Sequence, residues 1–244
     1  MSILPTRENY VSGKIVPVGK SWGLTKNVPF PNLYIKMLPE YKNWIFLEEE
    51  AVALKGRWAS VFDKPHHPVD LEIGCGNGFF FAQQVEAKPE RNLLGIELKY
   101  KPLVQTVRRV KNKNQGNGRG IRFHAGYIEG LFLAEEIHNI YIYFPDPWPK
   151  KRQQKNRLLN NDFFQKLFFL QKPNCFVDFK TDSLDYYECV LREVKKGPFK
   201  LIRQSYDLHK SEWNNENFMT SFEKIFANKG QPIYYLRLLK EDHQ

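Results

Sequence analysis

Cysteine is scarce in this 244-residue chain, and long apolar runs are absent. Three widely separated thiols, Cys75, Cys175 and Cys189, with no Cys/His cluster, exclude a disulfide framework and predict no metal site. No apolar stretch approaches the roughly 18 residues that span a bilayer, and the N-terminus lacks a basic-then-apolar signal pattern. We therefore expect a cytoplasmic protein that uses neither a membrane nor a metal.

Charge of one sign dominates the rest of the composition. Lysine and arginine exceed aspartate and glutamate by 37 to 27, which gives a net charge of +10, while 42% hydrophobic and 15% aromatic residues exclude a disordered chain. Eight basic residues lie in the acid-free run 98–122 and five more in the acid-free run 150–157. Such runs are typical of phosphate-backbone binding, and their alternative interpretation is two solvated helix faces.

The order of apolar segments predicts an α/β fold. Residues 1–62 contain five prolines and little periodicity, apart from a possible helix at 48–62, so we interpret them as an N-terminal arm beside a main domain at 63–244. In that domain short apolar strands alternate with helices, which favours a mostly parallel, seven-stranded sheet with helices on both faces. The expected strands are 69–73, 93–97, 121–124, 139–144, 175–180, 199–205 and 232–239, and the expected helices are 79–88, 100–114, 161–171 and 183–196.

Ligands of such folds bind beyond the carboxyl ends of the strands, so the residues after each strand are the functional candidates. The first strand runs into a loop with Gly74, Gly76 and Gly78, preceded by Glu72. This spacing lacks the third glycine of a dinucleotide fingerprint, and the acid favours a ligand with an ammonium group over a pyrophosphate. Glu97 ends the second strand, where an acid is placed to bind ribose hydroxyls. The alternatives are a glycine turn without a ligand and a surface glutamate.

Prolines frame an acid and an aromatic residue after the fourth strand. The segment Phe144-Pro-Asp146-Pro-Trp148-Pro-Lys150 is rigid, because each proline fixes its own backbone torsion. A carboxylate beside an aromatic ring and cations suggests a site for a nucleic-acid base. The alternative is a rigid connection with a core tryptophan.

Further polar residues follow the later strands. Asp182 comes after the fifth strand, and Thr220 and Glu223 precede the last one. Each of these residues also fits a helix cap or a surface position.

These motifs together resemble the tRNA (guanine-N7)-methyltransferase family of class I S-adenosylmethionine-dependent methyltransferases. The resemblance rests on the loop Leu71–Gly78, the proline-framed Asp146 segment with its basic run, Lys180-Thr-Asp182, and Thr220-Ser-Phe-Glu223, and it covers roughly residues 69–239. It implies a Rossmann-like fold and an enzyme that transfers a methyl group from S-adenosylmethionine to N7 of a guanine in the tRNA variable loop.

The resemblance also implies residue roles. Glu72, Gly74, Gly76, Gly78, Glu97 and Asp146 are expected to contact the cofactor, and Asp146 is expected to be the catalytic or guanine-orienting acid. Substrate contacts are expected from Lys150, Asp182, Thr220 and Glu223.

The chain departs from the family pattern at three positions. The family usually has an acid for the adenine after the third strand, where this chain has Gly126, whose backbone amide is expected to serve instead. Gln153 and Asn156 replace a histidine and an arginine in the basic run. Two alternatives stay open, namely a DNA amino-methyltransferase and a non-enzymatic RNA-binding module. The expected partner is tRNA, and the protein is expected to be a monomer or a homodimer.

Overall fold

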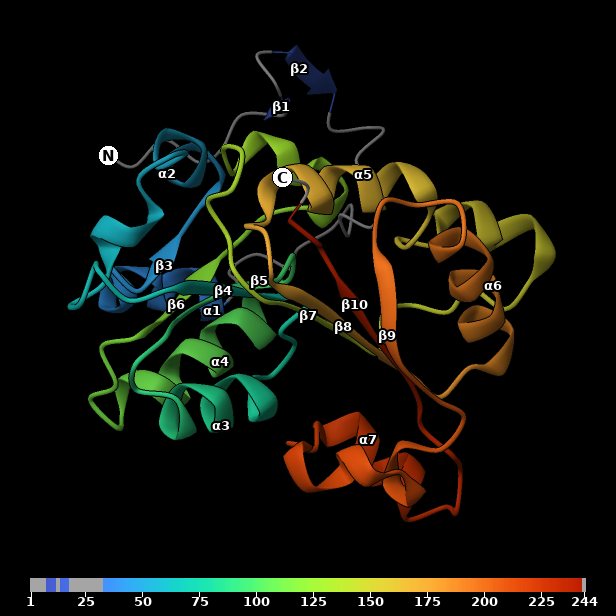
Figure 1. Ribbon diagram of the computed structural model, residues 1–244. Coiled ribbons are helices and arrows are strands. Elements are labelled where there is room, and N and C mark those ends of the chain that lie inside the picture. Colours follow the sequence, from blue (N-terminus) through green and yellow to red (C-terminus); the bar gives the residue numbers. More distant parts are fainter. Residues whose placement is uncertain (1–7, 12–13, 18–32, 243–244) are drawn as a thin grey trace.

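The computed structural model describes residues 8–11, 14–17 and 33–242. Eight strands form one sheet in the order β3-β6-β5-β4-β7-β8-β10-β9 (Figure 1). The strands are β3 (Ile45–Phe46), β4 (Val69–Ile73), β5 (Asn92–Ile96), β6 (Gly118–Ile121), β7 (Ile140–Tyr143), β8 (Phe176–Thr181), β9 (Lys200–Ser205) and β10 (Tyr234–Leu239). β1 (Glu8–Val11) and β2 (Lys14–Pro17) form a separate antiparallel pair.

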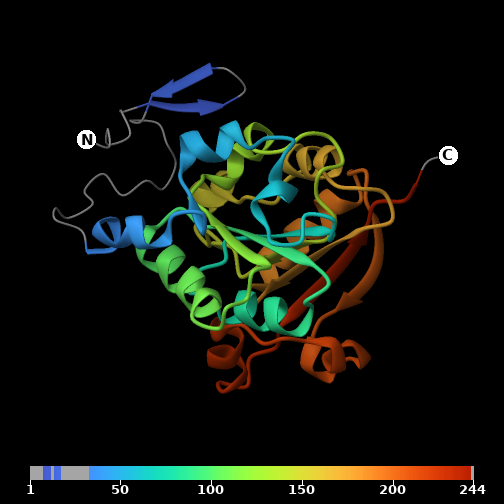
Figure 2. The same ribbon diagram turned by 90° about the vertical axis from the view of Figure 1, so that its left-hand side faces the viewer.

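Helices cover both faces of this sheet, as the two views together show (Figures 1 and 2). They are α1 (Leu33–Met37), α2 (Glu48–Ala53), α3 (Phe79–Ala87), α4 (Tyr100–Lys111), α5 (Asn161–Leu170), α6 (Leu184–Val194) and α7 (Ser221–Ala227). The pair α3 and α4 lies on one face, and α5 and α6 lie on the other (Figure 1). All five residues of β4 are buried, as expected for a strand covered on both sides. The predicted α/β class is therefore confirmed.

The strand directions place the loops of interest at one edge. β3 to β8 pair in parallel, and β10 runs antiparallel to both β8 and β9. The carboxyl ends of β4, β5, β7 and β8 therefore meet at the same edge of the sheet. The chain between β9 and β10, which includes α7, starts and returns at this edge, and α7 lies near α3 (Figure 1).

The predicted number of strands was one too low. Ile45 and Phe46, in the segment expected to be an arm, form the edge strand β3 against Gly120 and Ile121 of β6. Two residues are too short to show the alternation by which a strand is predicted. The division of the chain at residue 62 stays a prediction.

The bounds of the third predicted strand were wrong. β6 covers Gly118–Ile121, whereas we expected a loop up to residue 120 and a strand at 121–124. A Cβ atom at Gly118 would lie 2.9 Å from Val110 Cγ1, and one at Gly120 would lie 2.7 Å from Val107 Cγ2. These glycines therefore allow α4 to pack closely on the strand, which offsets their low intrinsic strand preference.

The predicted helix at 48–62 is broken in two. α2 ends at Ala53, and a 3-10 turn, η3 (Trp58–Val61), follows it. Gly56 between them has a φ of 78°, which a continuous helix does not allow. The backbone amides of Gly56 and Trp58 donate to the Glu136 carboxylate at 2.9 and 3.0 Å, so this carboxylate fixes the break.

Two hydrophobic clusters fill the layers on either side of the sheet. Leu71, Phe164 and Tyr186 belong to the cluster under α5 and α6, and Phe81 and Leu103 belong to the cluster under α3 and α4. In the part of the chain that the structure describes, no helix is long and apolar enough to cross a membrane.

Candidate active site

The loop after β4 has a backbone that only glycine adopts easily. Gly74, Gly76 and Gly78 have φ values of 79°, 54° and 77°. A Cβ atom at Gly78 would lie 2.6 Å from the Cα atom of Thr106 in α4, and Thr106 Oγ1 donates to the Gly76 carbonyl at 2.8 Å. The loop is thus held against α4, at the N-terminus of α3, with its backbone open to close approach by a ligand.

Glu72 lies beneath this loop as an incompletely paired buried acid. The residue is 3% exposed, and its Oε2 atom has no hydrogen-bond partner among the described residues. Burial, assisted by the nearby Glu97 carboxylate and opposed by the Lys180 ammonium, raises the pKa of Glu72 to about 8. Such an acid is ready to accept a cationic amino group, so the site fits the amino-acid end of S-adenosylmethionine.

Glu97 follows β5 and faces the same loop. Its Oε2 accepts from the Gly76 amide at 3.2 Å and its Oε1 accepts from the Lys99 amide at 2.9 Å. Burial raises the pKa of Glu97, although these backbone donors oppose the shift. These two backbone donors therefore hold the carboxylate at the carboxyl end of β5, which is the position predicted to bind ribose.

Gly126 lies in the 3-10 turn η4 (Ala125–Gly130) beyond β6. Its amide donates to His124 Nδ1 at 3.2 Å, and its carbonyl accepts from Lys166 Nζ at 2.9 Å. The predicted contact of its amide with the cofactor needs the His124 ring to release that donor, and it stays a prediction.

The proline-framed loop after β7 has a strained backbone. Phe144 and Trp148 have φ values of 52° and 43°, which are uncommon for residues other than glycine. The Phe144 amide donates to the Lys180 carbonyl at 2.8 Å, which ties the start of the loop to β8. Asp146 is exposed at its tip, and Trp148 is half-buried. The strain is localised at the segment whose acid is the candidate catalytic residue, as it is in many functional sites.

A buried ion pair lies between this loop and α7. Lys180 Nζ lies 3.1 Å from Glu223 Oε2 and 4.3 Å from the centroid of the Tyr143 ring. Glu223 Oε1 also lies 2.9 Å from His209 Nε2 and accepts from the Asn217 side chain at 2.5 Å. Burial lowers the pKa of Lys180, while Lys180, Asn217 and His209 together lower the pKa of Glu223 against its own burial.

Thr220 and Glu223 form a reciprocal helix cap. Thr220 Oγ1 accepts from the Glu223 amide at 3.0 Å, and Glu223 Oε2 accepts from the Thr220 amide at 3.4 Å. This is the capping-box pattern at the start of α7. Glu223 is fully buried, so the structure gives the pair a structural role, and their predicted contact with substrate is untested.

Asp182 and Lys150 complete the predicted set. Asp182 is half-buried just beyond β8, where burial raises the pKa of its carboxyl group. Lys150 is exposed and starts the 3-10 turn η5 (Lys151–Asn156). Both follow strands whose carboxyl ends lie at the edge that carries the glycine loop and Asp146.

The two basic runs are only partly available to an anion. Arg119 and Arg122 are buried, with Arg119 paired to Asp63 and Arg122 paired to Glu48. Arg157 is also buried and pairs with Asp185. These three arginines of the two runs are therefore held by partners inside the protein, and the exposed members of the runs are the ones available to a phosphate backbone. Sequence reasoning also gave no separate role to Lys180, because the burial of a strand lysine is not visible from charge alone.

The fold and this site define a class of protein, a Rossmann-like methyltransferase of class I whose cofactor is S-adenosylmethionine. A family model described as "Putative methyltransferase" matches residues 66–236. A tRNA (guanine-N(7)-)-methyltransferase of Bdellovibrio bacteriovorus is 44% identical over 82% of this chain and 97% of the relative. One of Clostridium novyi is 37% identical over 75% of this chain and 85% of the relative. The chain belongs to the tRNA (guanine-N(7)-)-methyltransferase family.

Solved structures support the fold alone. The 16S rRNA methyltransferase KamB aligns with a TM-score of 0.55 at 11% identity and covers 72% of this chain and 88% of that one. An S-adenosylmethionine-dependent methyltransferase from Aquifex aeolicus aligns with a TM-score of 0.51 at 10% identity, over 71% of this chain and 82% of that one.

Proposed function

We propose that this protein methylates N7 of a guanine in the variable loop of tRNA, with Asp146 as the acid that acts on the guanine. The family membership supports the reaction and the class of substrate. The observation that carries the role of Asp146 is its place on a strained, proline-framed loop, at the same sheet edge as Glu72 and the glycine loop.

Glu72, Glu97 and the glycine loop are the residues that fit the cofactor. The buried carboxylate of Glu72 would hold the amino group, Glu97 would hold the ribose hydroxyls, and the loop backbone would approach the ligand closely. When bound, S-adenosylmethionine supplies an electrophilic methyl group on a sulfonium centre. Residues 72–78 and Glu97 would hold the cofactor at the sheet edge that also carries Asp146.

Methylation of guanine N7 does not require a strong general base. Guanine N7 has a free lone pair and no proton, so the enzyme must align N7 with the methyl group and tolerate the positive charge that forms on the purine. Asp146 can accept hydrogen bonds from the N1 and amino donors of guanine, and it also stabilises that charge. This is catalysis by a preorganised charge, which commonly contributes a factor of about 10² to 10³ per group.

Exposed cations next to Asp146 are proposed to hold the RNA backbone. Lys150, Lys151 and Lys155 are exposed on and beside η5, together with Arg152. Such contacts position a nucleic acid without reading its sequence. A loop guanine is the accessible target, because the narrow major groove of duplex RNA hides N7.

We propose a cytoplasmic location. All three cysteines are free, as is usual in a reducing compartment. The described residues contain no group of three or more metal-ligating side chains. We leave the choice between a monomer and a homodimer to a measurement of the mass in solution.

The test combines one variant with an analysis of the product. Asp146→Asn should lower kcat on tRNA about 100-fold or more while the protein stays folded and binds S-adenosylmethionine. Asp162→Asn, at the start of α5 on the helix layer away from the glycine loop, is the matched control. Mass spectrometry of nucleosides should detect 7-methylguanosine in tRNA and no methylated base in a DNA acceptor. Near-normal turnover of Asp146→Asn would remove the assigned role, and an absence of cofactor binding by the wild-type protein would favour a non-enzymatic RNA-binding module.

A further inference from the structure

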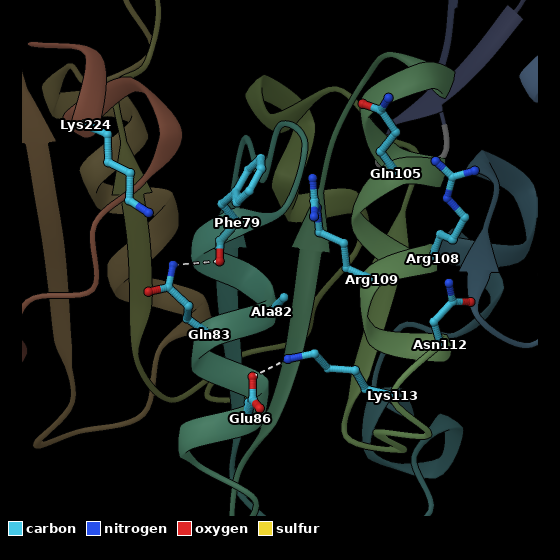
Figure 3. A pocket seen from close by; sticks show the side chains of 10 residues that line it. All are labelled: Phe79, Ala82, Gln83, Glu86, Gln105, Arg108, Arg109, Asn112, Lys113 and Lys224. Atoms are coloured by element: carbon cyan, nitrogen blue, oxygen red, sulfur yellow. Dashed lines mark hydrogen bonds and ion pairs between the residues drawn. The ribbon is translucent and has the colours of Figure 1, made fainter.

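A cavity of about 520 Å³ lies between α3, α4 and α7, on the face of the sheet away from α5 and α6 (Figure 3). One wall comes from α3, with Phe79 and Gln83 among its residues, and the other comes from α4, with Arg108 and Arg109. Lys224 of α7 reaches into it from the opposite side to α4 (Figure 3). We call this cavity the α3–α4 groove.

Positive charge is in excess along this groove. Its lining contains four cations and one acid, Glu86, and that acid is already paired with Lys113 at 2.5 Å. Within the described part of the chain, the three remaining cations, Arg108, Arg109 and Lys224, make no ion pair. Unpaired cations on α4 and on α7 attract an anion that lies along the groove.

An aromatic ring stands among these cations. Phe79 is 39% exposed, although it is a large apolar residue, and the guanidinium carbon of Arg109 lies 3.8 Å from its ring centroid. Figure 3 shows the Arg109 side chain extending towards this ring. A partly open aromatic ring with neighbouring cations is the combination that binds single-stranded nucleic acid, by base stacking and phosphate contact together.

The groove adjoins the glycine loop of the candidate active site. Arg109 Nε donates to the carbonyl of Asn77 in the glycine loop at 2.9 Å, and Ser221 at the start of α7 donates to the Asn77 side chain at 3.3 Å. Gln83 Nε2 donates to the Met219 carbonyl at 3.2 Å. The first two contacts join α4 and α7 to the loop that is expected to hold the methyl donor, and the third joins α3 to the segment before α7, so the groove lies next to that loop.

We propose that the α3–α4 groove binds an unpaired segment of the substrate RNA next to the methylated nucleotide. Arg108, Arg109 and Lys224 contact its phosphates, and one base stacks on Phe79. This inference rests on the proposed function for the identity of the RNA. It adds a second binding surface, which shares no residue with η5.

The first test removes charge from the groove. The double variant R108Q/K224Q is compared with K195Q/K196Q, which loses the same two charges from positions at the end of α6. The probe is a full-length unmodified tRNA transcript, whose affinity is measured by fluorescence anisotropy across a salt series. The groove variant should lower the slope of log affinity against log salt by about 1 for each lost contact, and it should raise the KM for tRNA about tenfold or more.

The control variant should keep the wild-type slope and KM. Turnover of R108Q/K224Q at saturating tRNA should stay within about twofold of wild type, because the groove holds RNA and does not touch the reacting atoms. An equal slope for the groove variant and the control variant would overturn the proposal. Failure to form 7-methylguanosine with wild-type protein would overturn the proposed function instead, and the two failures are therefore distinguishable.

The second test addresses stacking. Phe79→Leu should weaken tRNA binding about tenfold, because stacking of a base on an aromatic ring commonly contributes that much or more, and Phe79→Tyr should retain the wild-type affinity. Circular dichroism and S-adenosylmethionine calorimetry check that both variants fold and keep the adjacent cofactor site. Equal affinities of the leucine and tyrosine variants would remove Phe79 from the binding surface.

Discussion

Arg157 donates from Nε to the carbonyl of Pro147 at 2.8 Å, and thereby holds the loop that carries Asp146 from behind. Its terminal nitrogen pairs with Asp185 of α6, and its guanidinium lies 5.0 Å from the Tyr186 ring centroid. The last cation of the basic run therefore points into the protein, where it links α6 to the candidate catalytic loop. We infer that Arg157 is a positioning residue for Asp146.

Replacing Arg157 should lower turnover more than binding. In Arg157→Lys the charge remains, but the planar fork that reaches Pro147 and Asp185 together is lost. We expect kcat to fall about tenfold, with the KM for tRNA changed less than about threefold, since a misplaced group costs rate more than affinity. Steady-state kinetics on tRNA measure this. Arg192→Lys, at an exposed position in the last turn of α6, is the control and should behave as wild type.

The pKa of Glu72 predicts how cofactor binding depends on pH. Below about pH 8 the free protein keeps Glu72 largely protonated, whereas a bound ammonium group needs the carboxylate. S-adenosylmethionine should therefore bind more tightly as pH rises from 6 to 8, by up to about tenfold per pH unit, and should release a proton on binding. Titration calorimetry in buffers of different ionisation enthalpy measures both effects.

The same shift has a consequence for stability. A carboxyl group whose pKa is raised on folding stabilises the folded state below its unfolded pKa, and this contribution is lost as pH rises from about 4.5 to about 8. Glu72→Gln should thus stabilise the free protein at pH 8 by a few kcal/mol. The same variant should bind S-adenosylmethionine more weakly, and its affinity should depend less on pH. Thermal unfolding without ligand measures the first effect. A Glu212→Gln control, at an exposed position, should change neither property.

Gly78 in the glycine loop and Gly230 after α7 allow the cost of backbone torsional strain to be separated from the cost of a steric clash. Gly78 and Gly230 both have positive φ, of 77° and 69°, but only at Gly78 would an added Cβ atom meet other atoms within 4 Å, the nearest of them on Thr106. Gly230→Ala should lower the free energy of unfolding by about 1 kcal/mol. Gly78→Ala should lower it by about 2 kcal/mol or more, because the backbone of α4 must also move. Denaturant unfolding measures the difference. Equal losses of unfolding free energy in the two variants would show that α4 moves aside without an energetic cost.

The buried pair Asp178–Arg237 should matter to stability more than exposed pairs do. Arg237 donates twice to Asp178, at 2.7 Å from both Nε and Nη2, and Tyr235 donates to it at 3.0 Å. Asp178→Asn should cost about 3 kcal/mol or more, since it leaves the largely buried Arg237 guanidinium with only the exposed Glu216 carboxylate, 3.7 Å away. Glu241→Gln breaks the exposed pair with Lys200 and should cost less than about 1 kcal/mol. Urea unfolding of both variants provides the test.

The sheet was predictable because its strands are short apolar segments that end at glycine, proline or an acid. β4 alternates apolar residues with Asp70 and Glu72, which is the period of a strand, although both of its faces are buried. The bounds of β6 were not predictable in this way, because its glycines allow α4 to pack closely and have a low strand propensity. The two-residue strand β3 was not predicted, because its pairing depends on the position of β6 and a local sequence pattern does not indicate that position.

The site was predictable in its location and less so in its individual contacts. Parallel strands deliver Glu72, Glu97, Asp146 and Asp182 to one edge, which follows from topology alone. The sequence did not show that Arg119, Arg122 and Arg157 turn inward, because an arginine carries the same charge whether it faces solvent or a buried carboxylate. The pattern Thr220-x-x-Glu223 is a readable capping signal, and the structure contains that cap.

The position of β10 bears on how the chain reaches its native state during synthesis. This strand, Tyr234–Leu239, is close to the end of the sequence, yet it pairs with β8 on one side and β9 on the other. On the ribosome, β8 and β9 therefore emerge before the strand that joins them. Asp178 in β8 lacks its ion-pair partner Arg237 until β10 has been synthesised. A nascent chain or a nonsense product that stops before residue 234 leaves β9 unjoined to the rest of the sheet, and quality-control proteases should recognise it however complete its glycine loop is.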